Sequence, residues 1–467
     1  MSLGRLAGLL ERVGIIDRER LDRTVELSWP RIVTGFAIMS KQTVDLALVG
    51  WAVGPAAVAG LAYAYAYWTV AKFVGIGIAG GVVALVSQNY GGGDRARAAL
   101  VVKQGVWIAL GVVVPVALSY VLFADTLVGL FGSEPEPAEF GVTYLVVVAP
   151  ALVFEYLNLL ASRTYAGVGD TFTPMMVRAT GGLLNILLSG VFVFAGLGVT
   201  GVALGTLLST AAVTVVLGWG LLGRAYRLPG MSASPVTFRL GGPQFDRALS
   251  RQLVAVCAPL VGRQAARVAI VFPLLWIASA FGPVVVAALE VGRRVRDLLV
   301  SFDWGFSTAS STLVGQELGA GDESAAVAYG GAIVRLSFVV HLLAGSVVFV
   351  AAPWVARLFV SEPAELAQTA AFVRVAAATA VVAGVDGSLV GVLRGAGDTR
   401  WPFVATMVGQ YGVALPVAVA GLTTPLGVVG LYGALFCGAA VPIGVNGWRY
   451  RTGRWKAVSR AYRPAGG

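Results

Sequence analysis

The sequence predicts an all-α polytopic membrane protein, with about twelve transmembrane helices arranged as two pseudo-symmetric six-helix lobes. The first reason is composition, because 57% of the 467 residues are hydrophobic and 12% are charged, whereas soluble domains carry about 25% charged residues. The second is that apolar residues run continuously rather than alternating with polar ones, which favours membrane helices over barrel strands. The third is an internal repeat.

Four short motifs of the first half return at one offset in the second half. The segment RTYAGVGDTFTPM at 163–175 matches GVLRGAGDTRWPF at 391–403, which places Asp170 opposite Asp398 (398 − 170 = 228). The same offset relates three further pairs of motifs: 88–94 with 316–322, 131–135 with 359–363, and 54–55 with 282–283. Such duplication in an apolar chain indicates a transporter with its pathway between two like halves.

Apolar stretches of the ~20 residues that a membrane helix needs follow one another along the chain. They lie near 28–53, 57–85, 100–124, 140–162, 174–196, 199–222, 250–281, 284–313, 327–352, 367–392, 402–422 and 425–446. The first, seventh and eighth are the weakest, because charged residues interrupt them.

These stretches divide the chain into five predicted segments. They are a cytoplasmic amphipathic segment (1–27), an N-terminal six-helix lobe (28–223), a cytoplasmic inter-lobe linker (224–249), a C-terminal six-helix lobe (250–446) and a basic cytoplasmic tail (447–467). Apolar residues from Leu3 to Ile16 recur at helical spacing, so the first segment is expected to lie on the membrane surface, with no cleavable signal peptide.

Charge predicts how the chain sits in the plasma membrane, since positive residues mark the cytoplasmic side. Basic residues gather in the linker and in the tail, where Arg463 is the last of them, whereas the loop near 125–139 holds acidic residues and no Lys or Arg. Both termini are therefore expected inside. An even number of spans in each half makes the halves a parallel repeat.

Glycine-rich loops between the stretches contain a short acidic residue near the start of the next helix. These residues are Asp94, Asp170, Asp322 and Asp398. We expect them to cap the helices that follow; the alternative is that their loops act as cytoplasmic gates. No loop has the GxxxxGK pattern of a phosphate-binding site.

Several classes of function find no support in the residues. The single histidine, His341, is expected to pack, and the sequence has no HExxH, GxSxG or cluster of metal ligands, which argues against an enzyme and against a cofactor other than a coupling ion. Cys257 and Cys437 lie in apolar stretches and are expected to be core residues. The net charge of +10 lies beside membrane segments, so topology explains it better than nucleic acid does.

Four segments together resemble the multidrug and toxic compound extrusion (MATE) family of the MOP flippase superfamily. They are QTVDLALVGWAVG (42–54), SQNYGGGD (87–94), STLVGQELGAGD (311–322) and LRGAGDTRWP (393–402). The resemblance runs from Trp29 to about Asn446. It implies twelve helices in two lobes, alternating access, and export of organic cations against an inward flow of protons or sodium.

Asp45 lies deep in the first stretch and aligns with the acidic residue of the family's VDxxxVG motif. An ionised carboxylate in hydrocarbon costs about 2.5–3.5 kcal/mol and usually faces a cavity or a partner. It could therefore exchange a proton or a sodium ion for a cationic substrate. The alternative is a structural ion pair with Lys41, one turn earlier.

The resemblance also concerns the fourth and fifth stretches. DinF-like members place an Asn and an Asp one turn apart in the fifth; Asn185 matches the Asn, and Ser189 stands where the Asp is expected. Asn158 and Glu155 of the fourth stretch either contribute to the same site or hydrogen-bond between helices. Nearby aromatic residues such as Tyr65 either pack in the core or line a cavity.

In the second half, Asp386 is the repeat partner of Asn158 and resembles the carboxylate of the cation site in NorM-like members, so Na⁺ could bind near Asp45 or Asp386. Arg263 and Arg267 stand in the stretch where those members carry a Glu.

The eighth stretch contains six charged residues: Glu290, Arg293, Arg294, Arg296, Asp297 and Asp303. Glu290 with Arg294, and Arg293 with Asp297, are four apart, which predicts ion pairs in a buried, self-neutralising cluster. The alternative is that this charge network offers arginine to an anionic or zwitterionic substrate.

The leading hypothesis is a secondary active antiporter, monomeric and not an enzyme, that exports a cationic small molecule in exchange for H⁺ or Na⁺. A flippase for a lipid-linked or anionic substrate is the alternative, and a membrane-embedded enzyme or a channel is a distant third. Partners are the substrate and the lipid bilayer, without nucleic acid.

Overall fold

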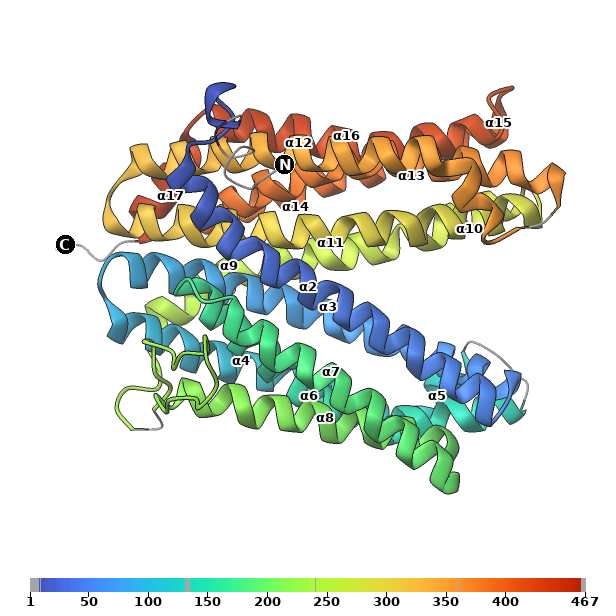
Figure 1. Cartoon of the computed structure of the whole chain (residues 1–467), viewed down its shortest axis with the longest axis horizontal. Coiled ribbons are helices and arrows are strands. Elements are labelled where there is room, and N and C mark those ends of the chain that lie inside the picture. Colours follow the sequence, from blue (N-terminus) through green and yellow to red (C-terminus); the bar gives the residue numbers. More distant parts are fainter. Residues whose placement is uncertain (1–7, 9, 131–134, 240, 361, 463–467) are drawn as a thin grey trace. The chain divides into compact units, whose positions relative to one another are not determined.

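The computed structural model describes residues 8, 10–130, 135–239, 241–360 and 362–462, and all regular structure in these ranges is helical (Figure 1). The chain forms two compact units. The N-terminal unit contains residues 33–90 and 94–257, and the C-terminal unit contains the residues up to 32, 91–93 and those from 258 onward. Leu3, Arg463 and most of the predicted repeat pair 131–135 lie outside the described residues.

The N-terminal unit is built from the first set of helices. They are α2 (Arg18–Ala52), α3 (Pro55–Gly91), α4 (Arg95–Leu122), α5 (Ala124–Gly129), α6 (Pro135–Gly167), α7 (Phe172–Phe192), η1 (Val193–Leu197) and α8 (Gly198–Leu221). Helix α8 packs along both α6 and α7. The chain turns between α7 and α8 at Gly196, whose φ of 91° is a left-handed conformation that glycine adopts at little cost.

The C-terminal unit contains the second set of helices and the first part of α2. Its helices are α9 (Arg247–Ala269), α10 (Val271–Ser279), α11 (Pro283–Ala320), α12 (Glu323–Arg357), α13 (Pro363–Gly395), α14 (Arg400–Met407), η2 (Val408–Ala414), α15 (Leu415–Thr423), α16 (Val428–Arg451) and α17 (Arg454–Tyr462). Helices α11 and α13 make the most extensive contact in the molecule.

The predicted all-α membrane fold is confirmed. Ten helical segments of the described chain are long and apolar enough to cross a membrane. One of them, Phe172–Leu221, has 50 residues and holds the turn at Gly196, so it crosses twice. Helix α11 is not among the ten, and its 38 residues contain the six charged residues of the eighth predicted stretch. With these two adjustments the helices match the twelve predicted stretches.

Helices α2 and α9 each contribute residues to both units, whereas the predicted segment boundaries assigned each stretch to a single lobe. Helix α2 starts at Arg18, before the expected position 28, and passes from one unit to the other after Ile32, near its internal Pro30. Helix α9 passes between the units after Cys257. The five predicted segments themselves stay a prediction.

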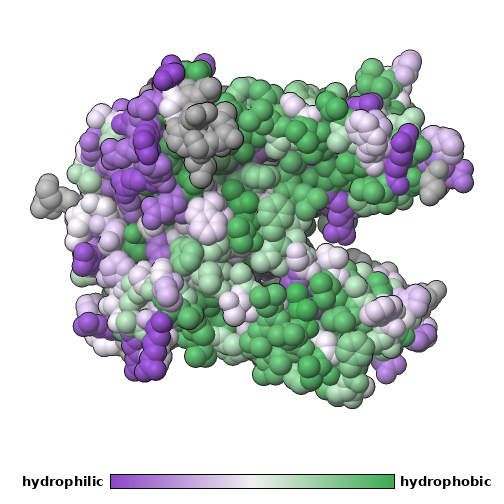
Figure 2. Space-filling view, in the orientation of Figure 1, coloured by the Kyte–Doolittle hydropathy of each residue, from purple (hydrophilic) through white to green (hydrophobic). Residues whose placement is uncertain are grey.

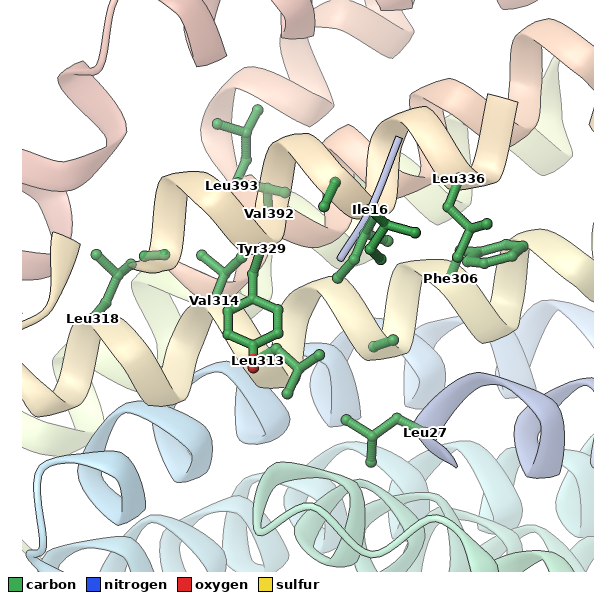
Figure 3. Packing of buried hydrophobic residues seen from close by; sticks show 14 of the residues in the cluster. Ile16, Leu27, Phe306, Leu313, Val314, Leu318, Tyr329, Leu336, Val392 and Leu393 are labelled. Carbon is green, nitrogen blue, oxygen red and sulfur yellow. The ribbon is translucent and has the colours of Figure 1, made fainter. Parts of the chain in front are cut away.

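The core of the C-terminal unit contains a hydrophobic cluster that joins the N-terminal segment to three long helices (Figure 3). Ile16 and Leu27 lie among side chains of α11, α12 and α13, including Phe306, Leu336 and Val392. Burial of apolar surface contributes about 25 cal/mol per Å², so this part of the N-terminal segment is held by packing against the unit.

The visible surface of each unit is apolar over the middle of its helices and hydrophilic near many helix ends, as Figure 2 shows. This distribution suits helices that meet hydrocarbon along their length and water or headgroups at their ends.

Three of the four predicted helix caps are present. Asp94 accepts a hydrogen bond from the Arg97 amide at 2.8 Å, and Asp322 accepts one from the Ala325 amide at 2.8 Å. Asp170 likewise accepts from the Thr173 amide at 2.9 Å. The prediction is wrong for Asp398, whose carboxylate accepts from Arg449 Nε at 2.7 Å, because a charged partner on α16 binds it more strongly than a neutral amide does.

Candidate functional site

A cavity of about 70 Å³ lies within the N-terminal unit, between α2, α3, α6, α7 and α8. Charged residues of both signs and three aromatic residues line it. The charged ones are Lys41, Asp45, Lys72, Glu155 and Arg178, and the aromatic ones are Tyr65, Trp68 and Tyr144. All five helices are apolar over most of their length, so these side chains are unusual for their surroundings.

Asp45 reaches the cavity from α2 and is 1% exposed. The Asn185 amide nitrogen lies 3.3 Å from Asp45 Oδ1 when the amide is oriented so that its oxygen accepts from the Thr206 amide at 3.1 Å; hydrogen bonding decides this orientation. Ser189 is fully buried, and its hydroxyl lies close enough to the Asp45 carboxylate to interact with it. The structure therefore brings Asp45, Asn185 and Ser189 together.

Lys41 lines the same cavity one helical turn before Asp45. The alternative interpretation of Asp45, a structural ion pair with Lys41, stays open: the two charges attract each other, but no contact within 4.0 Å joins these two described residues. The Lys41 ammonium also makes no hydrogen bond to any described residue. Spacing of four residues makes a pair possible on a helix, but the rotamers decide whether it forms.

Glu155 of α6 lines the cavity and also makes an expected helix–helix hydrogen bond, with a charged partner. Its Oε1 lies 2.9 Å from Arg178 Nη2 of α7 and 3.4 Å from Lys72 Nζ of α3. Sequence reasoning missed Arg178 and Lys72, although each is an isolated charge inside a predicted membrane stretch, and such charges usually have a partner or a function.

Asn158, one turn after Glu155, connects α6 to α8. It donates to the Thr210 carbonyl at 3.1 Å and accepts from the Thr214 hydroxyl at 2.9 Å. Asn158 therefore makes the expected helix–helix hydrogen bonds and lines the cavity as well.

One wall of the cavity is aromatic. The rings of Tyr65 and Tyr144 meet edge to face with centroids 5.4 Å apart, and Trp68 is 8% exposed. Such a wall can pack against an apolar or aromatic ligand and against the face of a cationic group.

The C-terminal unit contains a second buried polar cluster around Asp386 of α13. Arg263 of α9 lies 3.3 Å from its Oδ2, and Asn446 of α16 donates to its Oδ1 at 2.7 Å. The Arg263 guanidinium also donates to Thr406 at 3.1 Å. The structure thus brings Arg263 and Asp386 together in an ion pair.

Asp303 and Arg267 belong to the same region. Asp303 Oδ1 of α11 is buried without a hydrogen-bond partner among the described residues, and its charge acts on that of Arg267. Arg394 of α13 donates to the Ser307 carbonyl at 2.7 Å and to the Ser311 hydroxyl at 3.1 Å. Three arginines therefore face two carboxylates in this unit.

The ion pairs predicted along α11 are wrong in their partners. Glu290 pairs with Arg293 at 2.5 Å instead of Arg294, and Asp297 pairs with Arg296 at 3.1 Å instead of Arg293. Glu290 and Asp297 are 42% and 46% exposed, so the pairs are not a buried cluster. For Glu290, helix geometry places both the third and the fourth neighbour within reach, and spacing does not choose between them.

No group of three or more His, Cys, Asp or Glu side chains in the described part of the chain could hold a metal ion. His341 is buried and its Nδ1 lies 2.8 Å from the Ser337 carbonyl, in line with the packing role expected.

Comparison with known sequences places this chain beside proteins named for drug resistance. The model of the MatE family matches residues 30–191 and 259–420. The chain is 28% identical over 448 residues to the "Probable multidrug resistance protein NorM" of Bradyrhizobium diazoefficiens, which covers 92% of each chain. It is 24% identical over 374 residues to "Multidrug and toxin extrusion protein 1" of Xenopus tropicalis, which covers 79% of this chain and 63% of that protein.

Solved structures share the fold. An outward-facing multidrug resistance MATE family transporter of the MOP superfamily matches with a TM-score of 0.84 and 20% identity, over 94% of this chain and 96% of that one. A MOP superfamily transporter from Pyrococcus furiosus, for which reverse polarity of the binding pocket suggests a different function, matches with a TM-score of 0.83 and 20% identity, over 93% and 96%.

Proposed function

Because the chain belongs to the MatE family, whose model matches residues 30–191 and 259–420, we propose that it is a secondary active antiporter. It exports organic cations and drugs in exchange for inward H⁺ or Na⁺ by alternating access. It works as a monomer in the plasma membrane with both termini in the cytoplasm. The names of its relatives refer to multidrug resistance and toxin extrusion.

The observation that carries this proposal is the Asp45 carboxylate, which is buried in a membrane helix and lines the cavity of the N-terminal unit. A membrane carboxylate that reaches a cavity can hold a small cation or the cationic group of a substrate, but it does not hold both at once. This competition couples the inward flow of the ion to the outward flow of the substrate. Asn185 and Ser189 supply further polar atoms beside it.

The test uses purified protein in liposomes and a cationic rhodamine ethyl ester, with either a pH gradient or a sodium gradient imposed. We expect one gradient to drive efflux in the wild type and Asp45→Asn to abolish it. Asp125→Asn is the matched control, because it removes an exposed carboxylate of α5 that does not line the cavity. Efflux that neither gradient drives would contradict antiport, and efflux that survives in Asp45→Asn would remove Asp45 from the coupling step.

A second candidate is a flippase for a lipid-linked or anionic substrate. The cluster of Arg263, Arg267 and Arg394 around two carboxylates in the C-terminal unit favours it, since guanidinium groups bind phosphate and carboxylate in two-pronged geometry. Movement of a fluorescently labelled anionic lipid across the same liposomes, without gradient-driven movement of the rhodamine, would favour this candidate over the antiporter.

A further inference from the structure

The charges around the N-terminal cavity are not balanced. Lys41, Lys72 and Arg178 supply three positive charges, and Asp45 and Glu155 supply two negative ones. The cavity therefore keeps one positive charge in excess when every group is ionised. In a setting of low dielectric constant this excess favours a substrate that also carries an anionic group over one that carries only positive charge.

Lys41 is the cation of the cavity that has no direct ion-pair partner among the described residues. Glu155 accepts both Arg178 and Lys72 through the same oxygen, at 2.9 and 3.4 Å. Asp45 lies against the Asn185 amide, and its charge also attracts that of Lys41 without a contact within 4.0 Å. Lys41 lines the cavity without an ion pair or hydrogen bond to any described residue.

An ammonium group without a direct ion pair inside a membrane span is costly, and such groups are mostly functional. The chain contains only four lysines, at positions 41, 72, 103 and 456, against thirty arginines, and two of the four line this cavity. Lysine presents a rotatable point charge, whereas arginine presents a fixed fork. The residue type therefore suits an anionic group that arrives in more than one orientation.

The volume of the cavity and its aromatic residues indicate what the ligand carries besides its charged group. A volume of about 70 Å³ accepts a polar group but falls below the ~300–1,000 Å³ that drug-sized ligands occupy. The body of the ligand must therefore extend beyond this cavity. Tyr65, Trp68 and Tyr144 offer an apolar surface to the part next to the polar group.

We propose that Lys41 is a specificity-determining residue that selects substrates carrying an anionic group, such as a carboxylate, on an aromatic body. Together with a cationic group held at Asp45 one turn away, this makes a zwitterion the preferred substrate of the cavity. The inference rests on the proposed function, because it assumes that this cavity receives the transported compound.

The test compares two dyes that differ by one group: a rhodamine with a free benzoate and its ethyl ester. Fluorescence polarisation with purified protein in neutral detergent gives the Kd for each, and the ratio of the two cancels their partition into micelles. We expect the wild type to bind the free acid about tenfold more tightly than the ester, as one charge-assisted hydrogen bond predicts.

Variants of Lys41 separate the effect of its positive charge from a structural effect of the substitution. Lys41→Gln should bring the ratio of the two Kd values close to one, and Lys41→Arg should restore most of the preference. Lys456→Gln, which removes a lysine of α17 that does not line the cavity, should leave the ratio unchanged. Displacement of the free acid by benzoate supports a small carboxylate ligand, and displacement by short-chain phosphatidylglycerol but not by benzoate assigns the anionic group to a lipid.

Two outcomes would overturn the inference, and only the second of them would also count against the proposed antiporter. Equal ratios in the wild type and in Lys41→Gln would remove the role of Lys41 and leave the antiporter proposal intact. Binding of neither dye to the wild type would overturn the inference and would count against this cavity as the substrate site of the proposed antiporter.

Discussion

Arg178 of α7 donates from Nη2 to Glu155 Oε1 of α6 over 2.9 Å, and both side chains are less than a tenth exposed. Lys72 of α3 approaches the same oxygen at 3.4 Å. One carboxylate therefore joins three helices of the N-terminal unit, and it is the direct ion-pair partner of two of the three cations around the cavity. This arrangement leaves Lys41 as the cation of the cavity without a direct ion pair to a described residue.

This arrangement predicts unequal effects of removing its members. Glu155→Gln leaves two buried cations without their carboxylate and should destabilise by about 3–5 kcal/mol, the cost of breaking a buried pair. Arg178→Gln leaves Glu155 with Lys72 and should cost less. Thermal unfolding in detergent, followed by tryptophan fluorescence, measures both, and the double variant should be less destabilised than the sum of the singles. A larger loss for Arg178→Gln than for Glu155→Gln would contradict the shared-carboxylate arrangement.

The contact between α11 and α13 depends on a glycine that leaves no room for a side chain. A Cβ atom on Gly391 would lie 2.6 Å from the Ser307 carbonyl oxygen and 2.7 Å from Ser310 Cβ. Gly391→Ala should therefore destabilise by roughly 1–3 kcal/mol or more, because the helices must move apart. Gly444→Ala is the control, since a Cβ there meets nothing within 4 Å, and it should stabilise by up to about 1 kcal/mol. Equal melting temperatures of the two variants would contradict this packing.

The segment between α8 and α9 is tied to α4 by a buried lysine. Lys103 is 6% exposed and donates to the carbonyls of Gly241 and Pro243 at 2.8 and 3.2 Å. Lys103→Met keeps the length of the side chain and removes both hydrogen bonds, so trypsin should cleave near Arg239 and Arg247 about tenfold faster, as loss of charged hydrogen bonds predicts. Lys456→Met is the control, because its side chain lies in α17, and an unchanged cleavage rate in Lys103→Met would refute the tether.

The Asp322 cap at the start of α12 predicts that the stability of the folded protein depends on pH. The pKa of Asp322 lies below its ordinary value of 3.8, first because its carboxylate accepts the Ala325 amide and then because it accepts the Ser324 hydroxyl. A carboxyl group with a lowered pKa in the folded state stabilises that state above its ordinary pKa and loses the contribution as pH falls through the lowered one. The melting temperature of Asp322→Ala should therefore lie below that of the wild type from pH 5 to 7.

The same difference in melting temperature should shrink as the pH is lowered below 3.8. Asp322→Asn keeps an acceptor oxygen for the amide and should lie close to the wild type near neutral pH. A difference between wild type and Asp322→Ala that grows toward low pH would show that the sign of this contribution is wrong.

The sequence alone determined the class of the molecule and its internal order. Continuous apolar stretches required membrane helices, since backbone groups in lipid must be satisfied within the segment. The sequence also predicted the helix caps at Asp94 and Asp322, because a short acidic side chain before a helix needs only the amides of the next turn. Asp45 was identifiable because a carboxylate in such a stretch is rare.

The tertiary structure decided which charges meet. Glu155 finds Arg178, twenty-three positions later, and Asp386 finds Arg263 from another helix. Glu290 chooses Arg293 over Arg294 within its own helix. Helical spacing limits the candidates to a face, whereas the rotation of each helix and the rotamer of each side chain select the partner. The lack of a direct ion pair at Lys41 depends on these rotamers and on the partners of the other charges, and for that reason no pattern in the sequence revealed it.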